Sequence, residues 1–391
     1  MGKILFIFSS KKMPRAFLLA LFIILSAHIV EIFVLPINFF TFRIWESLIV
    51  HKLGPFLSGP FYPNMTFSMV EEGDLGAHTK FAVKKNVKWE TDRFGYRKRN
   101  EFVDRYDVVV VGDSDVAGSG LSQEDIFSEQ LERASGLATY PFAPAHINHF
   151  LYDQRFKDNF PRVVILEIIE RNLGSLPEIK TKNDHIFLRR LLKDVGRKTQ
   201  GLIIVCDRIS KKIMYMYSAQ AVNQAREKLL GYINSLFRDN AEKTQAKKPQ
   251  SPKKMLFLTS GESIALDKID GIVQKIKSYK EFLNKRGIRF IFFPLPDKET
   301  VYWDELPARI RPVFLKQLIK KLRNEGIEVI DVLGVFENAS KNHGILLYHT
   351  DDTHWNSNGV RLAVATAMEL LDGQEMFREK KDELIKNNLS K

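Results

Sequence analysis

The chain has 391 residues, of which 45% are hydrophobic, 11% aromatic and 27% charged, a composition that can bury a sizeable core and excludes wholesale disorder. Its length suggests one large domain or two ordinary ones. The single cysteine, Cys206, excludes an intrachain disulfide framework and any zinc or iron–sulfur site built on several cysteines. Of the net charge of +12, a surplus of 11 lies in residues 178–254, which hold 18 Lys and Arg against 7 Asp and Glu. A basic block of this kind favours a local docking surface over a generally basic, nucleic-acid-binding protein.

The N-terminal apolar run is predicted to cross a membrane. Residues 16–30 (AFLLALFIILSAHIV) are apolar apart from one serine and one histidine, and the run resumes after Glu31. About 20 helical residues cover the hydrocarbon core of a bilayer, so the run is long enough to span it. Four basic residues and no acidic residue among them precede the run: Lys3, Lys11, Lys12 and Arg15. This charge predicts a cytoplasmic N-terminus. We favour a cytoplasmic tail and uncleaved anchor over 1–43 rather than a cleaved signal peptide, which has a shorter apolar region and a small-x-small site, or a buried core helix.

Residues 44–104 are predicted to be a lead-in of irregular strands and turns, because they are rich in Gly, Pro, Asn and aromatic residues. From Asp107 onward, buried strands alternate with amphipathic helices. Five strands are predicted, in DVVVVG, ATY, RVVILEII, IRFIFFPLP and IEVIDV. The predicted helices are SQEDIFSEQLERA with Ser122 as its N-cap, one that closes at Gly287, PARIRPVFLKQLIKKLRNEG, and SNGVRLAVATAMELL from about Ser357. This alternation predicts a three-layer α/β/α domain over 105–391 with a five-stranded parallel sheet.

Residues 178–254 interrupt this alternation and are predicted to be a basic helical insertion. The stretches FLRRLL, LIIVCDRISKKIMYMYSAQAV and AREKLLGYINSLF combine apolar stripes with basic positions, and TQAKKPQSPKK is typical of a linker. Two interpretations stay open. The insertion is either a solvated segment made soluble by its lysines, or a surface that lies on the membrane or against a membrane partner.

A serine and a histidine form the candidate catalytic pair. In an open α/β sheet, reactive groups gather beyond the carboxyl ends of the strands. Ser114 follows the first strand within Gly-Asp-Ser, where a tight strand-to-helix junction presents the hydroxyl to solvent. A serine hydroxyl needs a neighbouring base, and His354 in the segment DDTHW is the candidate, with Asp352 or else Asp351 holding its imidazole. In isolation, the same segment could be a polar helix N-cap with a half-buried histidine.

Gly-Asp-Ser after the first strand, with D-x-H-W near the C-terminus, resembles the SGNH (GDSL-like) hydrolase superfamily. The stretches VVILEIIERNL, PLPDKETVYWDELP and HTDDTHWNSNG are similar to the SGNH domains of alginate O-acetyltransferases and related exopolysaccharide-acetylating proteins, and TDRFGYR resembles the segment often found ahead of such domains. The resemblance covers roughly 91–176 and 262–372. It implies an SGNH-hydrolase-like fold with Ser114 as nucleophile, His354 as base and Asp352 as orienting acid.

The chain departs from this family in two places. The alginate proteins place D-x-H-W before Gly-Asp-Ser, whereas this chain has the commoner SGNH order. The glycine that usually donates to the oxyanion from the second block should fall within 139–146, where no glycine occurs. The remaining candidates for the oxyanion or the substrate are Asn172, which is the candidate third-block asparagine, Arg171, Lys298 and Tyr302. The last two follow the fourth strand, where a turn with an exposed lysine is an equal alternative.

These observations predict a single-pass protein of the cytoplasmic (inner) membrane whose extracytoplasmic, periplasmic SGNH domain transfers acetyl groups to a polysaccharide through an acyl-enzyme on Ser114. We expect no cofactor and no metal. Acetyl-CoA is absent outside the cytoplasm, so a multi-spanning membrane acyltransferase is the expected acyl donor, with the basic insertion as its docking site. One alternative is a carbohydrate esterase, which would use the same triad with water as acceptor. The other is a non-catalytic scaffold or glycan-binding protein on the same fold, which the missing glycine favours.

Overall fold

The computed structural model describes residues 13–41, 43–100, 103, 105–157, 159–179, 186–215, 255–258, 264–307 and 309–372. Three expectations lie outside these residues: the cytoplasmic tail before residue 13, the third helix of the insertion over 225–237 and the linker over 244–254.

A five-stranded parallel sheet in the order β4-β3-β5-β6-β7 forms the centre of the molecule. Its strands are β3 (Val108–Val111), β4 (Thr139–Phe142), β5 (Val163–Ile169), β6 (Arg289–Leu295) and β7 (Glu328–Val329). They consist mostly of branched and aromatic apolar residues, which suit a sheet buried on both faces. The prediction of an α/β fold with a five-stranded parallel sheet is confirmed. Because β4 and β5 lie on opposite sides of β3, the strand order reverses at β3, which is the position where open α/β sheets bind ligands.

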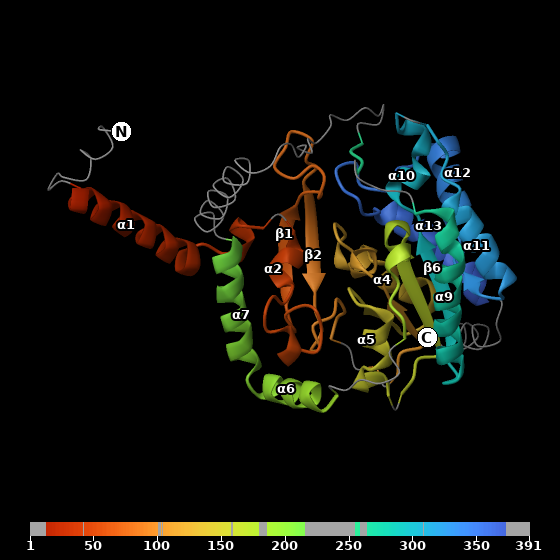
Figure 1. Cartoon of the computed structure of the whole chain (residues 1–391), viewed down its shortest axis with the longest axis horizontal. Coiled ribbons are helices and arrows are strands. Elements are labelled where there is room, and N and C mark those ends of the chain that lie inside the picture. Colours follow the sequence, from red (N-terminus) through yellow and green to blue (C-terminus); the bar gives the residue numbers. More distant parts are fainter. Residues whose placement is uncertain are drawn as a thin grey trace, which may run out of the picture.

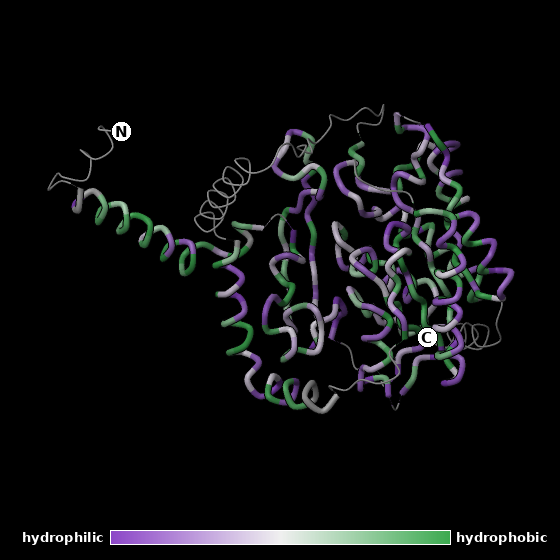
Figure 2. The backbone as a smooth tube through the Cα atoms, viewed as in Figure 1, coloured by the Kyte–Doolittle hydropathy of each residue, from purple (hydrophilic) through white to green (hydrophobic). Residues whose placement is uncertain are grey.

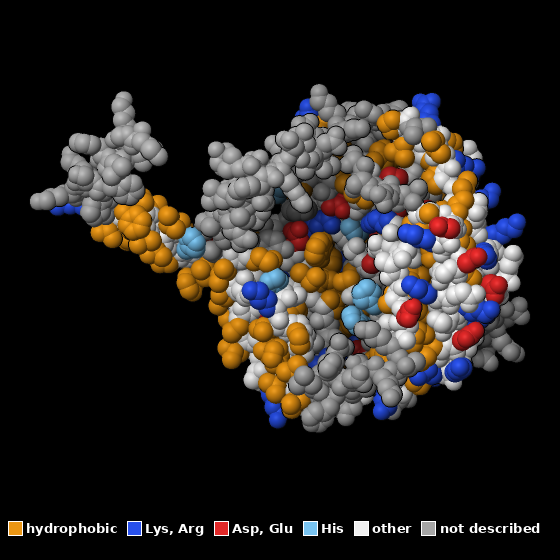
Figure 3. Space-filling model, viewed as in Figure 1, with side chains coloured by type: hydrophobic (Ala, Val, Ile, Leu, Met, Phe, Trp, Pro, Cys, Tyr) orange, Lys and Arg blue, Asp and Glu red, His pale blue; other side chains and the backbone are white. Residues whose placement is uncertain are grey.

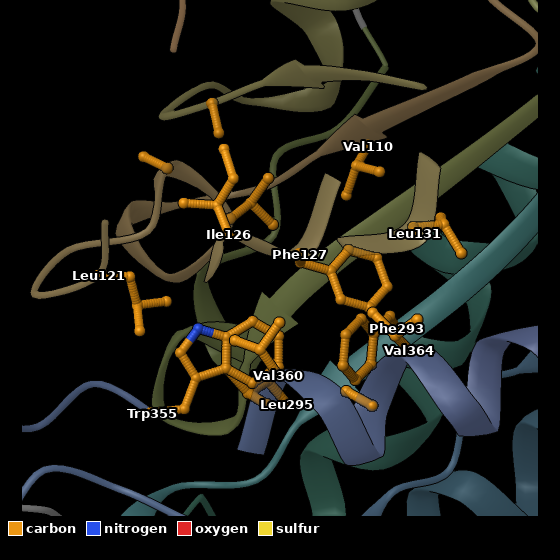
Figure 4. Close-up of a cluster of buried hydrophobic side chains, with 14 of the residues drawn as sticks. Val110, Leu121, Ile126, Phe127, Leu131, Phe293, Leu295, Trp355, Val360 and Val364 are labelled. Carbon is orange, nitrogen blue, oxygen red and sulfur yellow. The ribbon is translucent and has the colours of Figure 1, made fainter. Parts of the chain in front are cut away.

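Helices cover both faces of this sheet (Figure 1). One face carries α4 (Phe127–Ser135), α12 (Leu333–His343) and α13 (Ser357–Asp372), and the other carries α5 (Ile147–Leu151), α9 (Ile269–Asn284) and α11 (Phe314–Asn324). The four valines of β3 divide between these faces, since Val108 and Val110 belong to one apolar cluster and Val109 and Val111 to the other. In the first cluster, Trp355 stacks on Phe127 with ring centroids 6.0 Å apart (Figure 4). This packing ties the segment around His354 to the core of the domain.

Two helix starts differ from the prediction. Helix α4 begins at Phe127, after a 3₁₀ turn over Gln123–Asp125. The hydroxyl of Ser122 caps no helix, because it accepts a hydrogen bond from the backbone N–H of Lys88 and donates to a neighbouring carbonyl. Helix α11 begins at Phe314, seven residues later than PARIRPV suggests, because Pro312 has no N–H and disfavours helix at the residue before it.

The N-terminal segment projects from the domain as α1 (Met13–Ile29), followed by a π-helical turn, η2 (Val30–Val34) (Figures 1 and 2). Within the described residues, one helix is long and apolar enough to cross a membrane, over Phe17–Val34, with a mean hydropathy of 2.6 and no residue of that window buried. This is compatible with a single-pass anchor.

The lead-in and the insertion pack together beside the sheet domain. The lead-in contains α2 (Ile44–Leu48) and an antiparallel pair, β1 (Thr66–Glu71) and β2 (Lys85–Glu90). The described part of the insertion is α6 (Ile186–Lys198) and α7 (Gln200–Tyr215). The carboxylate of Asp207 in α7 accepts hydrogen bonds from three backbone N–H groups of the lead-in and from the hydroxyl of Tyr62. The insertion is therefore fixed to the lead-in through buried polar contacts.

Candidate active site

Ser114 is the first residue of the short helix α3 (Ser114–Ala117), immediately beyond the carboxyl end of β3. The side chain of Asp113 caps this helix by accepting a hydrogen bond from the N–H of Asp115 at 3.0 Å. The junction needs glycine at position 112, because a Cβ there would lie 2.5 Å from Oε2 of Glu167 and 2.5 Å from a methyl group of Val116. The glycine of Gly-Asp-Ser thus leaves room for the buried side chains of Glu167 and Val116 beside the end of β3.

The structure brings Ser114, His354 and Asp352 into hydrogen-bond contact. Nε2 of His354 lies 2.8 Å from Oγ of Ser114, and its Nδ1 lies 2.7 Å from Oδ1 of Asp352. The same carboxylate oxygen accepts the backbone N–H of His354 at 3.1 Å. Two segments 240 residues apart in the chain thus meet in the order nucleophile, base and acid that serine hydrolases use.

Asp352, and not Asp351, contacts the imidazole. The carboxylate of Asp351 turns toward the lead-in, where its Oδ2 accepts the N–H of Gly73 at 2.8 Å and the N–H of Val83 at 2.7 Å. Its backbone carbonyl accepts two more N–H groups of the same segment. Asp351 therefore fastens the loop between β1 and β2 over the site, while its neighbour faces His354.

Lys298 and Tyr302 support the segment that carries Asp352 and His354. Both side chains are 1% exposed. Nζ of Lys298, in α10 (Lys298–Val301), donates to three backbone carbonyls, those of His349, Thr350 and Asp352. The hydroxyl of Tyr302 accepts the backbone N–H of Leu347 at 2.9 Å. The structure does not support Lys298 and Tyr302 as substrate contacts, because both are buried. Their hydrogen bonds instead hold the backbone of the loop that carries Asp352 and His354.

Arg43 and two charged residues of the lead-in, Asp74 and Lys85, also lie at the site. The sequence patterns indicated none of the three. Nη2 of Arg43 lies 3.0 Å from Oδ2 of Asp352, and the two side chains are 4% and 1% exposed. The same nitrogen lies 3.4 Å from Asp74, and Nζ of Lys85 lies 3.7 Å from Asp352. Asp74 in turn accepts the N–H and the hydroxyl of Thr353. Arg43 lies three residues after Phe40, at the end of the apolar run, so in the sequence it has the position of a membrane-flanking cation.

The charged groups around His354 and Asp352 set the protonation of these two residues. Burial disfavours the imidazolium, but the carboxylates of Asp352 and Asp115 outweigh it and raise the pKa of His354 to about 9. Arg43 opposes this rise. Burial would raise the pKa of Asp352, yet His354, Arg43 and Lys85 together hold it well below its usual range. The acid is thus ionised, and the imidazole is a strong base.

A group of carboxyl side chains surrounds the start of α3, next to Ser114. Asp115 is fully buried, and burial raises its pKa to about 7. Burial and the charge of Asp113 raise the pKa of Glu167 well above its usual value, and its Oε2 accepts the N–H of Asp113 at 3.2 Å. Ligand atoms of Asp113, Asp115 and Glu167 lie within 4.8 Å of one another, as do those of Asp74, Asp352 and His354. These are the two groups among the described residues whose spacing suits a cation; in the second, Asp352 and His354 are already hydrogen-bonded to each other.

The two oxyanion candidates differ in their contacts. Nδ2 of Asn172, an exposed residue, donates to Oδ2 of Asp113 at 3.4 Å, so its amide contacts the residue that precedes Ser114. The guanidinium of Arg171 pairs with Asp297, whose Oδ1 lies 2.5 Å from Nη1. Asn172 is therefore the better placed of the two to donate to an oxyanion at Ser114.

A five-stranded α/β/α sheet that presents a serine after its first strand and a histidine before its last helix is the architecture of an SGNH hydrolase-like protein. A family model described as ALGX, the SGNH hydrolase-like domain of acetyltransferase AlgX, matches residues 256–387. The match covers β6, the DDTHW segment and α13, whereas Ser114 lies outside it. It confirms the predicted resemblance, and the chain carries an SGNH hydrolase-like domain similar to that of AlgX acetyltransferases. No curated protein matches the chain.

Proposed function

We propose that this protein is a membrane-anchored O-acetyltransferase that acetylates an extracytoplasmic polysaccharide. The observation that supports it most is the hydrogen-bonded series of Ser114, His354 and Asp352, at 2.8 and 2.7 Å, within an acetyltransferase-type SGNH domain. A scaffold without activity would not need a buried acid kept ionised next to a histidine that touches a serine.

The proposed reaction has two steps. His354 takes the proton of Ser114 while Oγ attacks the acetyl carbonyl of the donor, and the leaving group departs with that proton. The acetyl-serine is then attacked by a sugar hydroxyl, whose proton goes to His354 and back to Ser114. In both steps the negative charge on the carbonyl oxygen would be stabilised by the N–H of Ser114 and the amide of Asn172.

The proposed location follows from the apolar α1 and the basic residues before it. The domain would face the extracytoplasmic side, and a multi-spanning membrane acyltransferase would supply the acetyl group. A reporter that is active only outside the cytoplasm, fused after Lys391, should be active. Recovery of the full-length protein from the cytosol would contradict this location.

Ser114→Ala tests the catalytic proposal. Turnover of a chromogenic acetyl ester by the purified full-length protein should fall by about 10⁴-fold or more, because the atom that carries the acetyl group is gone. Ser122→Ala, a nearby serine that bonds to β2, should leave turnover unchanged. Unchanged acetylation by a folded Ser114→Ala protein would refute the triad and favour the scaffold alternative.

The esterase alternative shares every residue of this site and differs only in the acceptor. Acetyl ester turnover in the presence of an oligosaccharide separates the two, because a transferase moves isotope-labelled acetyl to the sugar. If all of the label appears as acetate and none on any acceptor, the protein is an esterase.

A further inference from the structure

Helix α7 has the reverse of the pattern expected for a helix that faces water, because apolar side chains lie on its outward side. Its outward side carries Leu202, Val205, Ile209, Ile213 and Met214, between 38% and 67% exposed, together with the exposed Cys206. We call this set the apolar face of α7. A helix exposed to water normally shows charged residues and buries apolar ones, as α11 does with Lys316 and Lys320 outward and Leu318 and Leu322 inward.

The inward side of α7 carries the charges. Asp207 is fully buried, and its carboxylate accepts four hydrogen bonds from the lead-in. Lys211 is 1% exposed, and its Nζ donates to the backbone carbonyls of Glu46, Ser47 and Ile49. These contacts fix the rotation of the helix about its axis, so its apolar side cannot turn inward without leaving buried charges unpaired.

The apolar face is continuous with the exit of the apolar helix α1. Helix α7 contacts η2, and Nζ of Lys212 donates to the carbonyls of Ile32 at 2.9 Å and Leu35 at 2.6 Å. Phe33 and Val34, at the end of the apolar run, are also strongly exposed. In Figure 1, α7 runs crosswise to α1, and in Figure 3 hydrophobic side chains cover α7 on the side from which α1 projects.

We propose that the apolar face of α7 lies in the surface layer of the bilayer that α1 crosses, so that the protein contacts lipid through a second, interfacial helix. This proposal rests on the membrane location proposed above. A helix that lies in the plane of the interface, with apolar side chains among the acyl chains and its polar contacts on the protein side, is a stable arrangement for such a sequence. Lys212 suits this position, since its ammonium reaches the carbonyl groups of Ile32 and Leu35 at the end of the apolar run, as a lysine at a membrane boundary can do.

The single cysteine of the chain lies within this face, so it can carry a probe without removal of any other thiol. The full-length protein is labelled at Cys206 with an environment-sensitive nitrobenzoxadiazole dye and placed in vesicles of phosphatidylethanolamine and phosphatidylglycerol that contain a spin-labelled quencher lipid. Two reference sites are labelled in a Cys206→Ser background: Ile23→Cys within α1 and Lys320→Cys on α11. We expect blue-shifted emission and several-fold stronger lipid quenching at Cys206 than at Lys320→Cys.

Paired substitutions test the face itself. Val205→Gln with Ile209→Gln should reduce lipid quenching at Cys206 several-fold, because polar side chains weaken insertion of the helix. The matched control is Ile310→Gln with Val313→Gln, an exposed pair outside α7, which should leave the quenching unchanged.

Each failure has a separate meaning. If Ile23→Cys is quenched by lipid while Cys206 is as open to aqueous iodide as Lys320→Cys, the interfacial helix is refuted and the anchor stands. If Ile23→Cys is not quenched either, the proposed membrane location itself fails. If Cys206 is shielded in native membranes but open in lipid vesicles, the face binds a membrane protein, and the lipid proposal is overturned.

Discussion

Arg43→Gln removes the positive charge that pairs with the proposed orienting acid. In the structure, Nη2 of Arg43 lies 3.0 Å from Asp352, both side chains are almost fully buried, and Nη1 donates to the hydroxyl of Ser119 at 3.1 Å. Removal of one partner from a buried ion pair costs about 3–5 kcal/mol of stability. We expect the lower end of that range, because Lys85, at 3.7 Å from Asp352, still supplies a positive charge.

The expected effect on turnover follows from the position of Arg43 behind the acid. Loss of the orienting acid of a serine–histidine–aspartate triad costs about 10⁴-fold in kcat. Arg43 contacts the acid and neither Ser114 nor His354, so we expect a smaller loss of about 10- to 100-fold, which is about 1.4–2.7 kcal/mol of the activation barrier. Arg43→Lys, which keeps the charge but not the second contact, should lose less.

The pH dependence separates a positioning role from a structural one. His354 acts as a base only when neutral, so activity should rise as the pH passes its pKa of about 9. Because Arg43 lowers the pKa of His354, Arg43→Gln should move this rise to higher pH. The assay is kcat/KM for a chromogenic acetyl ester as a function of pH, with Arg99→Gln, a half-exposed arginine paired with Glu90, as the control. A variant that is less stable but keeps the parental pH profile would refute the positioning role.

Three substitutions of aspartate by asparagine test the other carboxylates. The pKa of Asp115 is raised from 3.8 to about 7, so its ionisation costs stability as the pH rises between these values; Asp115→Asn should remove this loss in thermal unfolding measured from pH 4 to 8. Since Asp115 also raises the pKa of His354, the same variant should move the activity profile to lower pH, opposite to Arg43→Gln. Asp351→Asn should cost about 1–3 kcal/mol in denaturant unfolding, because it weakens two buried hydrogen bonds, and should reduce kcat far less than Asp352→Asn; a larger kcat effect at Asp351 would reverse the two roles. Asp207→Asn should destabilise the full-length protein by a similar 1–3 kcal/mol without moving the pH profile, and an unchanged midpoint would contradict the anchoring of α7.

The sheet and the Ser114–His354 contact could be predicted from the sequence because their signals are local. Four consecutive valines ahead of a glycine favour a buried strand, because β-branched residues suit strands, and a parallel sheet brings the carboxyl ends of its strands to one edge. Once Ser114 and His354 are each placed after a strand, their meeting follows from the topology. The choice between Asp351 and Asp352 could not be predicted, because both lie within three residues of His354. Only the path of the lead-in, whose N–H groups bind Asp351, leaves Asp352 to contact the imidazole.

The charges that Arg43, Asp74 and Lys85 bring to the site could not be predicted, since they depend on contacts between residues that are far apart in the chain. Arg43 and Asp352 are 309 positions apart. The burial of Lys298 could not be predicted for the same reason. Its position after β6 was predictable, but its three hydrogen bonds to carbonyl groups depend on how the loop of residues 349–352 folds over it. For α7, the sequence pattern shows two faces and cannot show which one is inside, because the lead-in supplies the partners that make the charged face the buried one.

One series of contacts connects the proposed membrane surface to the proposed catalytic acid. Lys211 of α7 holds the carbonyl groups of α2, and Arg43, which immediately precedes α2, pairs with Asp352. The exit of α1, the lead-in and the segment of Asp352 and His354 are therefore packed as one unit, in which Arg43, just ahead of the domain, also belongs to the candidate active site. With α7 in the bilayer surface, such a unit would hold Ser114 at a fixed height above the membrane. This arrangement would suit the proposed acyl donor in the membrane, because Ser114 would then meet an acetyl group that cannot diffuse away from the bilayer.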